Sequence, residues 1–373
     1  MHFSRYSLLC LFIAICLIAC KKVEDVGPQF DPASTWQPNN NFLFAEKTQL
    51  NSYADSSVLI LSSIQTTAIA PGEDHAKSDT TFTHYSGQAQ PNGRTDYRPL
   101  LSSSFLVFLT NDRISVLPTA SPVLERGDDY VRMPQFDADF ASFITLPINQ
   151  GETMVVNRQN QFIVPYYRYD RSYPTPAISG NSINLALVSV DVATLPAAGL
   201  AIKKTQTVIL DGAYFPFSIS SAGNYFTVSG LGGTFRVAPD GTYQKTYPYG
   251  LLRQFSFNGT LYGVTTAGGS SLQLAASTDQ GKTWLVIAGP LPDAYRQLTF
   301  KLVNNQLIAM YNSQLFQLKF TGNTLTPTEL DNTNLFGNQI TSVAAFHNTV
   351  YVSTLSGVFT KPLRTFLTPK KEQ

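Results

Sequence analysis

Residues 253–289 read RQFSFNGTLYGVTTAGGSSLQLAASTDQGKTWLVIAG and carry the clearest structural pattern in the chain. Hydrophobic and polar residues alternate on both sides of Asn258-Gly259, which is the pattern of two half-buried strands joined by a tight hairpin turn. Two further runs of strand-forming residues follow, beginning at Leu272 and Thr283. The stretch therefore predicts four consecutive antiparallel strands.

The same arrangement recurs three more times, in residues 215–248, 296–330 and 340–363. When the four units are stacked, their first turns fall at Gly223, Gly259, Asn305 and Asn348, which lie 36, 46 and 43 residues apart. Glycine and asparagine tolerate the positive φ that such turns require. Units of roughly 40 to 50 residues with four strands each are typical of propeller blades.

Weaker copies of the unit precede these four, around Leu59, Asp112 and Asn160. We therefore predict an all-β fold, a β-propeller over residues 42–366 with four-stranded antiparallel blades. Seven blades are predicted, with six or eight as alternatives, and with long insertions at about 65–98 and 165–183. A β-sandwich or a two-domain all-β protein is less favoured, because sandwiches do not repeat a four-strand unit. The last unit is short of a strand after Leu363, and we expect residues 41–46 to fill that place and close the ring.

Composition agrees with a large folded core. The chain has 373 residues, of which 43% are hydrophobic and 14% are charged, and this combination excludes disorder over most of its length. Its 26 basic and 25 acidic residues give no excess of positive charge of the kind that nucleic-acid binding requires. We expect the protein to be monomeric.

The N-terminus has the features of an export signal. Arg5 precedes an apolar stretch, Ser7 to Ala19, whose 13 residues are too short to span a bilayer. The run ends in Leu17-Ile18-Ala19-Cys20, which resembles a bacterial lipobox; the alternative is an ordinary signal peptide with a chance cysteine. The resemblance implies cleavage before Cys20 and a diacylglycerol chain on its thiol, palmitate being a typical acyl group.

The resemblance to bacterial lipoproteins also implies a location. Residues 1–19 would be the signal peptide, and 20–41, a proline-containing polar segment, would be the lipidated cysteine and a flexible tether. Cys20 would anchor the protein to a membrane of the bacterial envelope, and we expect the outer membrane, on its periplasmic or its outer side. Residues 367–373 are expected to form a C-terminal tail.

One octapeptide carries a second resemblance. Ser277-Thr278-Asp279-Gln280-Gly281-Lys282-Thr283-Trp284 resembles the Asp box, or bacterial neuraminidase repeat, and Ala238 to Tyr243 is a degenerate copy. We expect the Asp279 carboxylate to accept backbone N–H groups across the turn between the two outer strands of a blade. Gly281 would supply a positive φ, Ser277 and Thr283 complete the pattern, and Trp284 would pack between blades. In families that carry it, the Asp box is a folding element.

Sialidases also carry Asp boxes, so a sialidase or another glycoside hydrolase is the alternative function. The nearest string to the sialidase F/Y-R-I-P motif is Phe235-Arg236-Val237-Ala238-Pro239, which has an extra residue and lies in mid-chain. The acidic pairs Asp128-Asp129 and Glu73-Asp74 are more typical of solvated loops than of a glycosidase site. We therefore assign no catalytic residue.

Metal and cofactor patterns are weak. Glu73, Asp74 and His75, with Asp79 and His84, lack the spacing of a zinc site, and we predict no metal site. Without a phosphate-binding glycine loop between a strand and a helix, no cofactor is predicted either.

The segment with the strongest recognition chemistry runs from Pro165 to Pro174 and contains Tyr166, Tyr167, Arg168, Tyr169, Arg171 and Tyr173. Tyrosine rings and arginine planes bind sugars and peptides, so we predict that this loop binds a ligand. The alternative is an extended strand whose tyrosines pack between blades. With the 65–98 insertion as a second contact surface, the prediction is a binding or assembly module for a glycan or protein partner.

Overall fold

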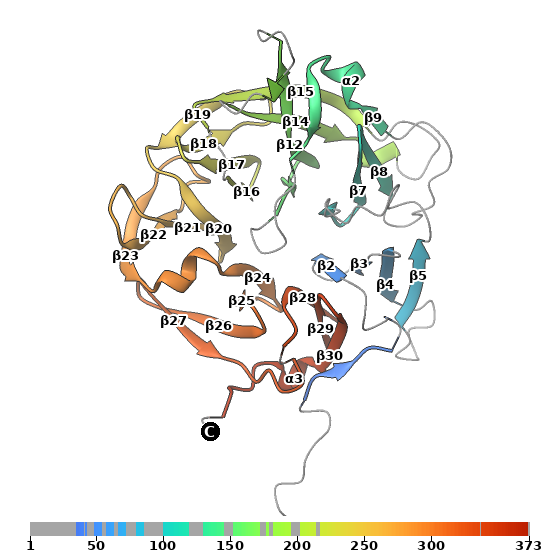
Figure 1. The fold of residues 1–373 in the computed structure, drawn as a ribbon, viewed down its shortest axis with the longest axis vertical. Helices are drawn as coiled ribbons and strands as arrows, with labels where there is room; N and C mark the ends of the chain where they lie inside the picture. The colour runs from blue at the N-terminus through green and yellow to red at the C-terminus, as the bar shows by residue number, and fades with distance from the viewer. Residues whose placement is uncertain are drawn as a thin grey trace, which may run out of the picture.

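The computed structural model describes residues 35–40, 42, 48–53, 57–62, 66–71, 80–85, 100–118, 130–144, 152–171, 177–178, 182–194, 202–213, 217–335 and 337–371. These residues form seven antiparallel sheets, six of four strands and one of six. The sheets follow one another around a common centre (Figure 1). The fold is a β-propeller, as the repeat predicts.

Four sheets come from the units that the sequence identifies most clearly. The first contains β16 (Ser218–Ala222), β17 (Tyr225–Gly230), β18 (Gly233–Val237) and β19 (Tyr243–Tyr247). The second contains β20 (Leu251–Phe257), β21 (Thr260–Thr265), β22 (Leu272–Ser277) and β23 (Leu285–Leu291). The third contains β24 (Thr299–Val303), β25 (Gln306–Tyr311), β26 (Gln314–Thr321) and β27 (Thr324–Glu329). The fourth contains β28 (Ile340–Phe346), β29 (Thr349–Thr354), β30 (Gly357–Pro362) and β1 (Gln37–Pro38).

The other three sheets lie in the first part of the chain. One contains β2 (Thr48–Tyr53), β3 (Ser57–Ser62), β4 (Thr66–Pro71) and β5 (Thr80–Tyr85). The next contains β6 (Leu100–Leu101), β7 (Phe105–Thr110), β8 (Arg113–Pro118) and β9 (Tyr130–Arg132). The six-stranded sheet contains β10 (Phe140–Phe143), β11 (Val155–Val156), β12 (Gln161–Asp170), β13 (Ala177–Ile178), β14 (Ser182–Val190) and β15 (Ile202–Asp211). Short helical turns connect strands: α2 (Met133–Phe136), η2 (Val192–Thr194), η3 (Asp293–Arg296) and α3 (Leu363–Phe366).

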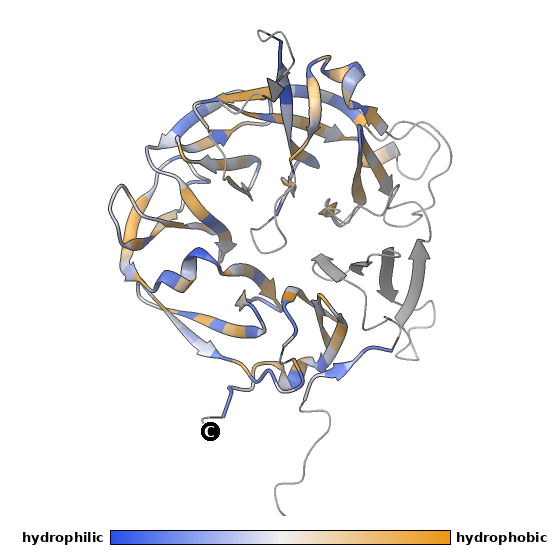
Figure 2. Cartoon of the chain, in the orientation of Figure 1, coloured by the Kyte–Doolittle hydropathy of each residue, from blue (hydrophilic) through white to orange (hydrophobic). Residues whose placement is uncertain are grey.

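The innermost strands make the ring. Strand β2 contacts β6 on one side and β28 on the other, and the sequence of contacts continues through β24, β20 and β16 to β11. Each of the larger hydrophobic clusters lies between neighbouring sheets: Phe255 and Val264 of one sheet, for example, share a cluster with Leu307 and Leu318 of the next. Figure 2 shows that the outer strand β27 and the closing strand β1 are, by contrast, mainly hydrophilic. The propeller is therefore stabilised by face-to-face packing of its sheets.

The ring closes with N-terminal residues, but earlier in the chain than predicted. Strand β1 pairs with β30, and Trp36 is fully buried, with its indole Nε1 donating to the Asp331 carbonyl at 3.0 Å. The side chain of Lys361, also buried, pairs with the Asp331 carboxylate at 2.8 Å. Of residues 41–46 the structure describes Phe42, which packs against β28, β29 and β30. The predicted tether therefore overlaps the fold, because Trp36 anchors this segment to the ring. The prolines and polar residues of the segment had indicated a flexible tether.

Two other predicted boundaries are corrected. The region predicted as the 65–98 insertion contains β4 and β5, which complete a four-stranded sheet. The predicted tail beyond residue 366 also packs on the ring, where Thr368 and Lys370 form backbone hydrogen bonds with residues 331 and 329. Both segments are short strands or bridges without a strong hydrophobic alternation, so the sequence pattern missed them. Within the described residues, no helix has the length and apolar character needed to cross a membrane.

Candidate functional site

The Tyr/Arg segment that the sequence predicts as a binding loop lies mostly on strand β12. This strand pairs with β10 on one side and β14 on the other. Tyr166 is fully buried and Tyr167 packs against a hydrophobic cluster, whereas Tyr169 is 41% exposed. Tyr173 lies outside the described residues. The prediction of a loop is therefore wrong, and the alternative of an extended strand holds, because ladder hydrogen bonds on both sides fix the segment.

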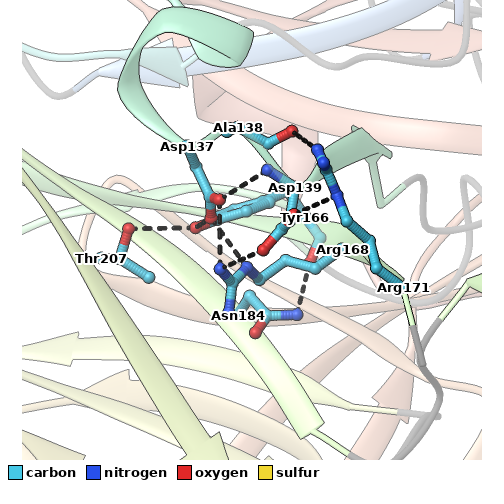
Figure 3. A network of polar contacts seen from close by, with 8 residues as sticks. All are labelled: Asp137, Ala138, Asp139, Tyr166, Arg168, Arg171, Asn184 and Thr207. Atoms are coloured by element: carbon cyan, nitrogen blue, oxygen red, sulfur yellow. Dashed lines mark hydrogen bonds and ion pairs between the residues drawn. The ribbon is translucent and has the colours of Figure 1, made fainter.

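The charged members of this segment belong to an internal network (Figure 3). The Tyr166 hydroxyl donates to Asp137 Oδ2 at 2.6 Å. Arg168 pairs with Asp137 at 2.9 Å and with Asp139 at 3.0 Å, and Arg171 pairs with Asp139 at 2.7 Å. Two arginines are thus matched by two aspartates that follow helix α2.

Burial in this network sets the chemistry of Tyr166. Desolvation, with the hydrogen bond to Asp137, raises the pKa of its phenol well above the usual 10. Asn184 adds a hydrogen bond from its side-chain amide to the Tyr166 carbonyl at 3.3 Å. A permanently protonated, buried tyrosine is a structural group, so the network fixes α2 and β10 onto β12.

The octapeptide 277–284 forms the turn between β22 and β23, the two outer strands of their sheet. Asp279 accepts the Thr283 backbone N–H at 2.9 Å, the Thr283 hydroxyl at 2.6 Å and the Ser277 hydroxyl at 2.8 Å. Desolvation works to raise the pKa of this carboxyl, but the hydrogen bonds from Thr283 and Ser277 lower it to about 2. Gly281 has φ +81°, and a Cβ there would lie 2.4 Å from a Thr227 methyl of the preceding sheet. Trp284 packs against Tyr247 with ring centroids 6.3 Å apart.

A second, shorter turn with an aspartate that accepts from a threonine follows β18, as the degenerate copy in the sequence suggests. Asp240 accepts the Thr242 backbone N–H at 2.9 Å and its hydroxyl at 2.7 Å. Arg236, from the string compared with the sialidase motif, donates from Nε to the Gln280 carbonyl at 2.9 Å and lies over the Tyr225 ring. Arg236 therefore joins two sheets at the outer turn.

The described residues contain an open cavity of about 620 Å³ at the centre of the ring. It is bordered by the inner strands β16, β20, β24 and β28 near their first turns, and by the segment before β11. Its lining mixes small polar, amide, aromatic and aliphatic side chains: Glu152, Val155, Ile219, Ser220, Ser221, Gln254, Phe255, Ser256, Phe300, Lys301, Leu302, Asn304, Asn305, Leu307, Ala345, Phe346, His347 and Leu363. A concave site with a few convergent polar groups is where a protein of this kind binds a ligand.

Two contacts organise the polar side of the cavity. Lys301 on β24 forms an ion pair with Glu152, which reaches the same space from the segment before β11. The Gln254 amide donates to the Ser218 carbonyl at 2.9 Å and accepts the Thr227 hydroxyl at 2.7 Å. The Gln254 contacts join two neighbouring sheets, whereas the Lys301–Glu152 pair links two sheets that are separated by two others in the ring.

An aromatic stack ends at this cavity. Phe257, Phe320, Tyr262, Phe255 and Phe300 follow one another with centroid distances of 5.9, 4.6, 5.2 and 4.4 Å and interplanar angles of 28° or less. Phe300 is the last ring of the series and is a lining residue. Phe255, which stacks on Phe300, lines the cavity too, so the series ends in two aromatic rings at the cavity wall.

The cavity residues are absent from the predicted site, although the sequence contains a signal for them. The positions three residues before the four matched turns are Ser220, Ser256, Leu302 and Ala345, and all four line the cavity. Their register follows from the repeat, because equivalent positions of the inner strands face the same axis. The signal for the site is therefore the equivalent position in each repeat unit and not a cluster of tyrosines and arginines.

Several predicted residues are not tested by the structure. Cys20 lies outside the described residues, as do Glu73, Asp74, His75, Asp79, Asp128 and Asp129, and His84 lies on β5, where side chains are not described. In the described part of the chain, no three His, Cys, Asp or Glu side chains come together in a way that could hold a metal ion.

Comparison with known proteins supports the fold alone. No family model matches the sequence, and no curated protein matches it; the Asp box therefore stays a resemblance. The β-propeller domain of Nup133 from Vanderwaltozyma polyspora has a TM-score of 0.51 at 8% identity, covering 84% of this chain and 93% of that one.

Two bacterial structures are also similar. PorZ, a surface component of the type-IX secretion system of Porphyromonas gingivalis, has a TM-score of 0.47 at 14% identity over 91% of this chain, which spans 39% of that protein. AztD from Citrobacter koseri has a TM-score of 0.47 at 13% identity, over 87% of this chain and 85% of that one. At these values the similarity carries no functional argument.

Proposed function

We propose that this protein is a lipid-anchored, extracytoplasmic binding module that receives a glycan or protein partner in the central cavity of its propeller. The observation that carries the proposal is the open cavity, where four inner strands present hydroxyl, amide and aromatic side chains to one space. A site of this size and composition suits recognition of part of a larger molecule.

Binding is favoured over glycoside hydrolysis by the charges at the cavity. Most glycosidases use two carboxyl groups that flank the scissile bond. Among the described lining residues the carboxylate is Glu152, and it is engaged by Lys301. No specific observation supports hydrolysis as a second function.

The cavity is tested by filling it. Ser256 is exposed and lines the cavity, so Ser256→Trp should place a large side chain in the space without disturbing the core. Ser271→Trp is the matched control, because Ser271 is exposed in the β21–β22 connection and is not a lining residue. Binding is measured on a glycan array and by cross-linking to envelope proteins. Loss of ligand in Ser256→Trp alone supports the proposal, and equal binding by both variants contradicts it.

The lipid anchor is tested separately. Cys20→Ser should remove the acylation site, release the protein from membranes and abolish incorporation of labelled palmitate. Membrane fractionation of wild type and variant measures this. A Cys20→Ser protein that stays with membranes and retains the lipid label would contradict the anchored location and leave the cavity proposal standing.

A further inference from the structure

We infer that the ligand of the central cavity is an uncharged glycan, which lies on Phe300 and is hydrogen-bonded by the surrounding hydroxyl and amide side chains. This inference rests on the proposed function and makes it specific. Three features of the cavity support it: its charge balance, its hydrogen-bonding groups and its aromatic wall.

The charges at the cavity argue against an anionic ligand. Lys301 is paired with Glu152, and both are lining residues. Arg253, which lines a smaller cavity that shares Glu152 and Phe300 with the central one, donates to the carbonyls of Leu298 and Leu252 at 3.1 and 2.9 Å. A bound carboxylate or sulfate ester needs a cation or several directed N–H donors to offset the free-energy cost of its desolvation. Here the ammonium group of Lys301, the lysine that faces the space, is already engaged.

The remaining polar groups suit hydroxyl-rich chains. Ser220, Ser256, Asn304 and Asn305 line the cavity, and the last three are exposed. Their side chains form no hydrogen bond with another group in the described part of the chain. Serine hydroxyls both donate and accept, and asparagine amides offer two donors and an acceptor, which is the mixture that neighbouring sugar hydroxyls require. An extended peptide typically binds by pairing with an open sheet edge. The serine and asparagine side chains of the cavity lie instead on inner strands and their turns.

The aromatic wall supplies the apolar part of such a site. Phe300 has Phe255 stacked against one face at 4.4 Å and is itself part of the cavity lining. The C–H face of a sugar ring packs on an aromatic ring and keeps its hydroxyls at the rim. Because the stack behind Phe300 fixes the ring in advance, little conformational entropy is lost when the ligand binds.

The experiment compares neutral and carboxylate-bearing oligosaccharides of the same length on an array, followed by calorimetry with the tightest binder. We expect the full-length protein to bind the neutral series and Phe300→Leu to weaken binding at least tenfold. Phe320→Leu is the matched control, since Phe320 belongs to the same aromatic stack but does not line the cavity. It should bind as wild type. Thermal melting of both variants checks that they are folded.

A charge variant gives a second readout. Glu152→Gln should leave Lys301 without its partner and shift preference toward carboxylate-bearing sugars by about tenfold, while Phe300→Leu should not change the preference. Wild-type preference for acidic sugars would overturn the inference. The inference would also be overturned if wild type bound no glycan but captured a protein partner that Ser256→Trp did not capture. That result would leave the proposed function intact. Ligand binding that Ser256→Trp does not affect would overturn both.

Discussion

The Tyr/Arg network around Asp137 and the central cavity contain similar side-chain chemistry but arrange it in opposite ways. In the network, Tyr166, Arg168 and Arg171 each meet an aspartate or a carbonyl, so the groups satisfy one another. In the cavity, Ser256, Asn304 and Asn305 are exposed beside an aromatic wall. The comparison shows that residue types suited to recognition mark a binding site only where the fold leaves them unsatisfied.

The largest expected effect on stability comes from breaking the network. Asp137→Ala removes one of two partners from the Tyr166 hydroxyl, which keeps Thr207, and from Arg168, which keeps Asp139. The Asp137 side chain is only 7% exposed. Since two partly buried polar groups each lose one partner at once, we expect the free energy of unfolding to fall by about 2 kcal/mol. Urea denaturation measures it. Ligand binding, corrected for the folded fraction, should be unchanged, and a specific loss of binding would contradict the separation of the two regions.

A smaller effect is expected at the turn that holds Asp279. Asp279→Ala removes three hydrogen bonds, but the residue is only half-buried at a surface turn, so we expect a loss of about 1 kcal/mol. Equilibrium denaturation of Asp279→Ala and of Lys282→Ala, a neighbouring exposed control, tests this. A loss in Asp279→Ala no larger than in the control would show that the carboxylate does not stabilise the turn.

The same carboxyl predicts a pH dependence. Its pKa in the folded protein is about 2, below the ordinary value of 3.8, so its contribution is complete above about pH 4 and is lost as the pH falls through 2. Acid titration of stability should therefore differ between wild type and Asp279→Asn in that window. Parallel curves for the two proteins from pH 5 to pH 2 would contradict the assigned hydrogen bonds.

The smallest effect is expected for the outer residues of the Tyr/Arg segment. Tyr169 is 41% exposed, and the Arg171 side chain is 65% exposed in its pair with Asp139. Exposed ion pairs contribute about 1 kcal/mol or less. The double variant Tyr169→Ala/Arg171→Ala should therefore melt within a few degrees of wild type, as scanning calorimetry can show. A large loss of stability would mean that the network extends further than its buried members.

The repeat made most of the fold predictable because hairpin turns constrain both residue type and spacing. Gly223, Gly259 and Asn305 adopt positive φ as predicted, although at the last turn His347 and not Asn348 takes that conformation. The closing strand was misplaced by a few residues, because a single buried tryptophan does not produce a periodic pattern. Sequence distance also hides which side chains meet, so the pairing of Asp137 with Arg168, and of Glu152 with Lys301, could not be predicted.

We propose that the cavity, and not the Tyr/Arg segment, binds the ligand. The most direct test is the affinity of Ser256→Trp and of Tyr169→Ala/Arg171→Ala for the oligosaccharide that wild type binds, measured by calorimetry on folded protein. We predict that Ser256→Trp abolishes binding and that the double variant binds within about twofold of wild type. Undiminished binding by Ser256→Trp, together with loss of binding in the double variant, would contradict the claim.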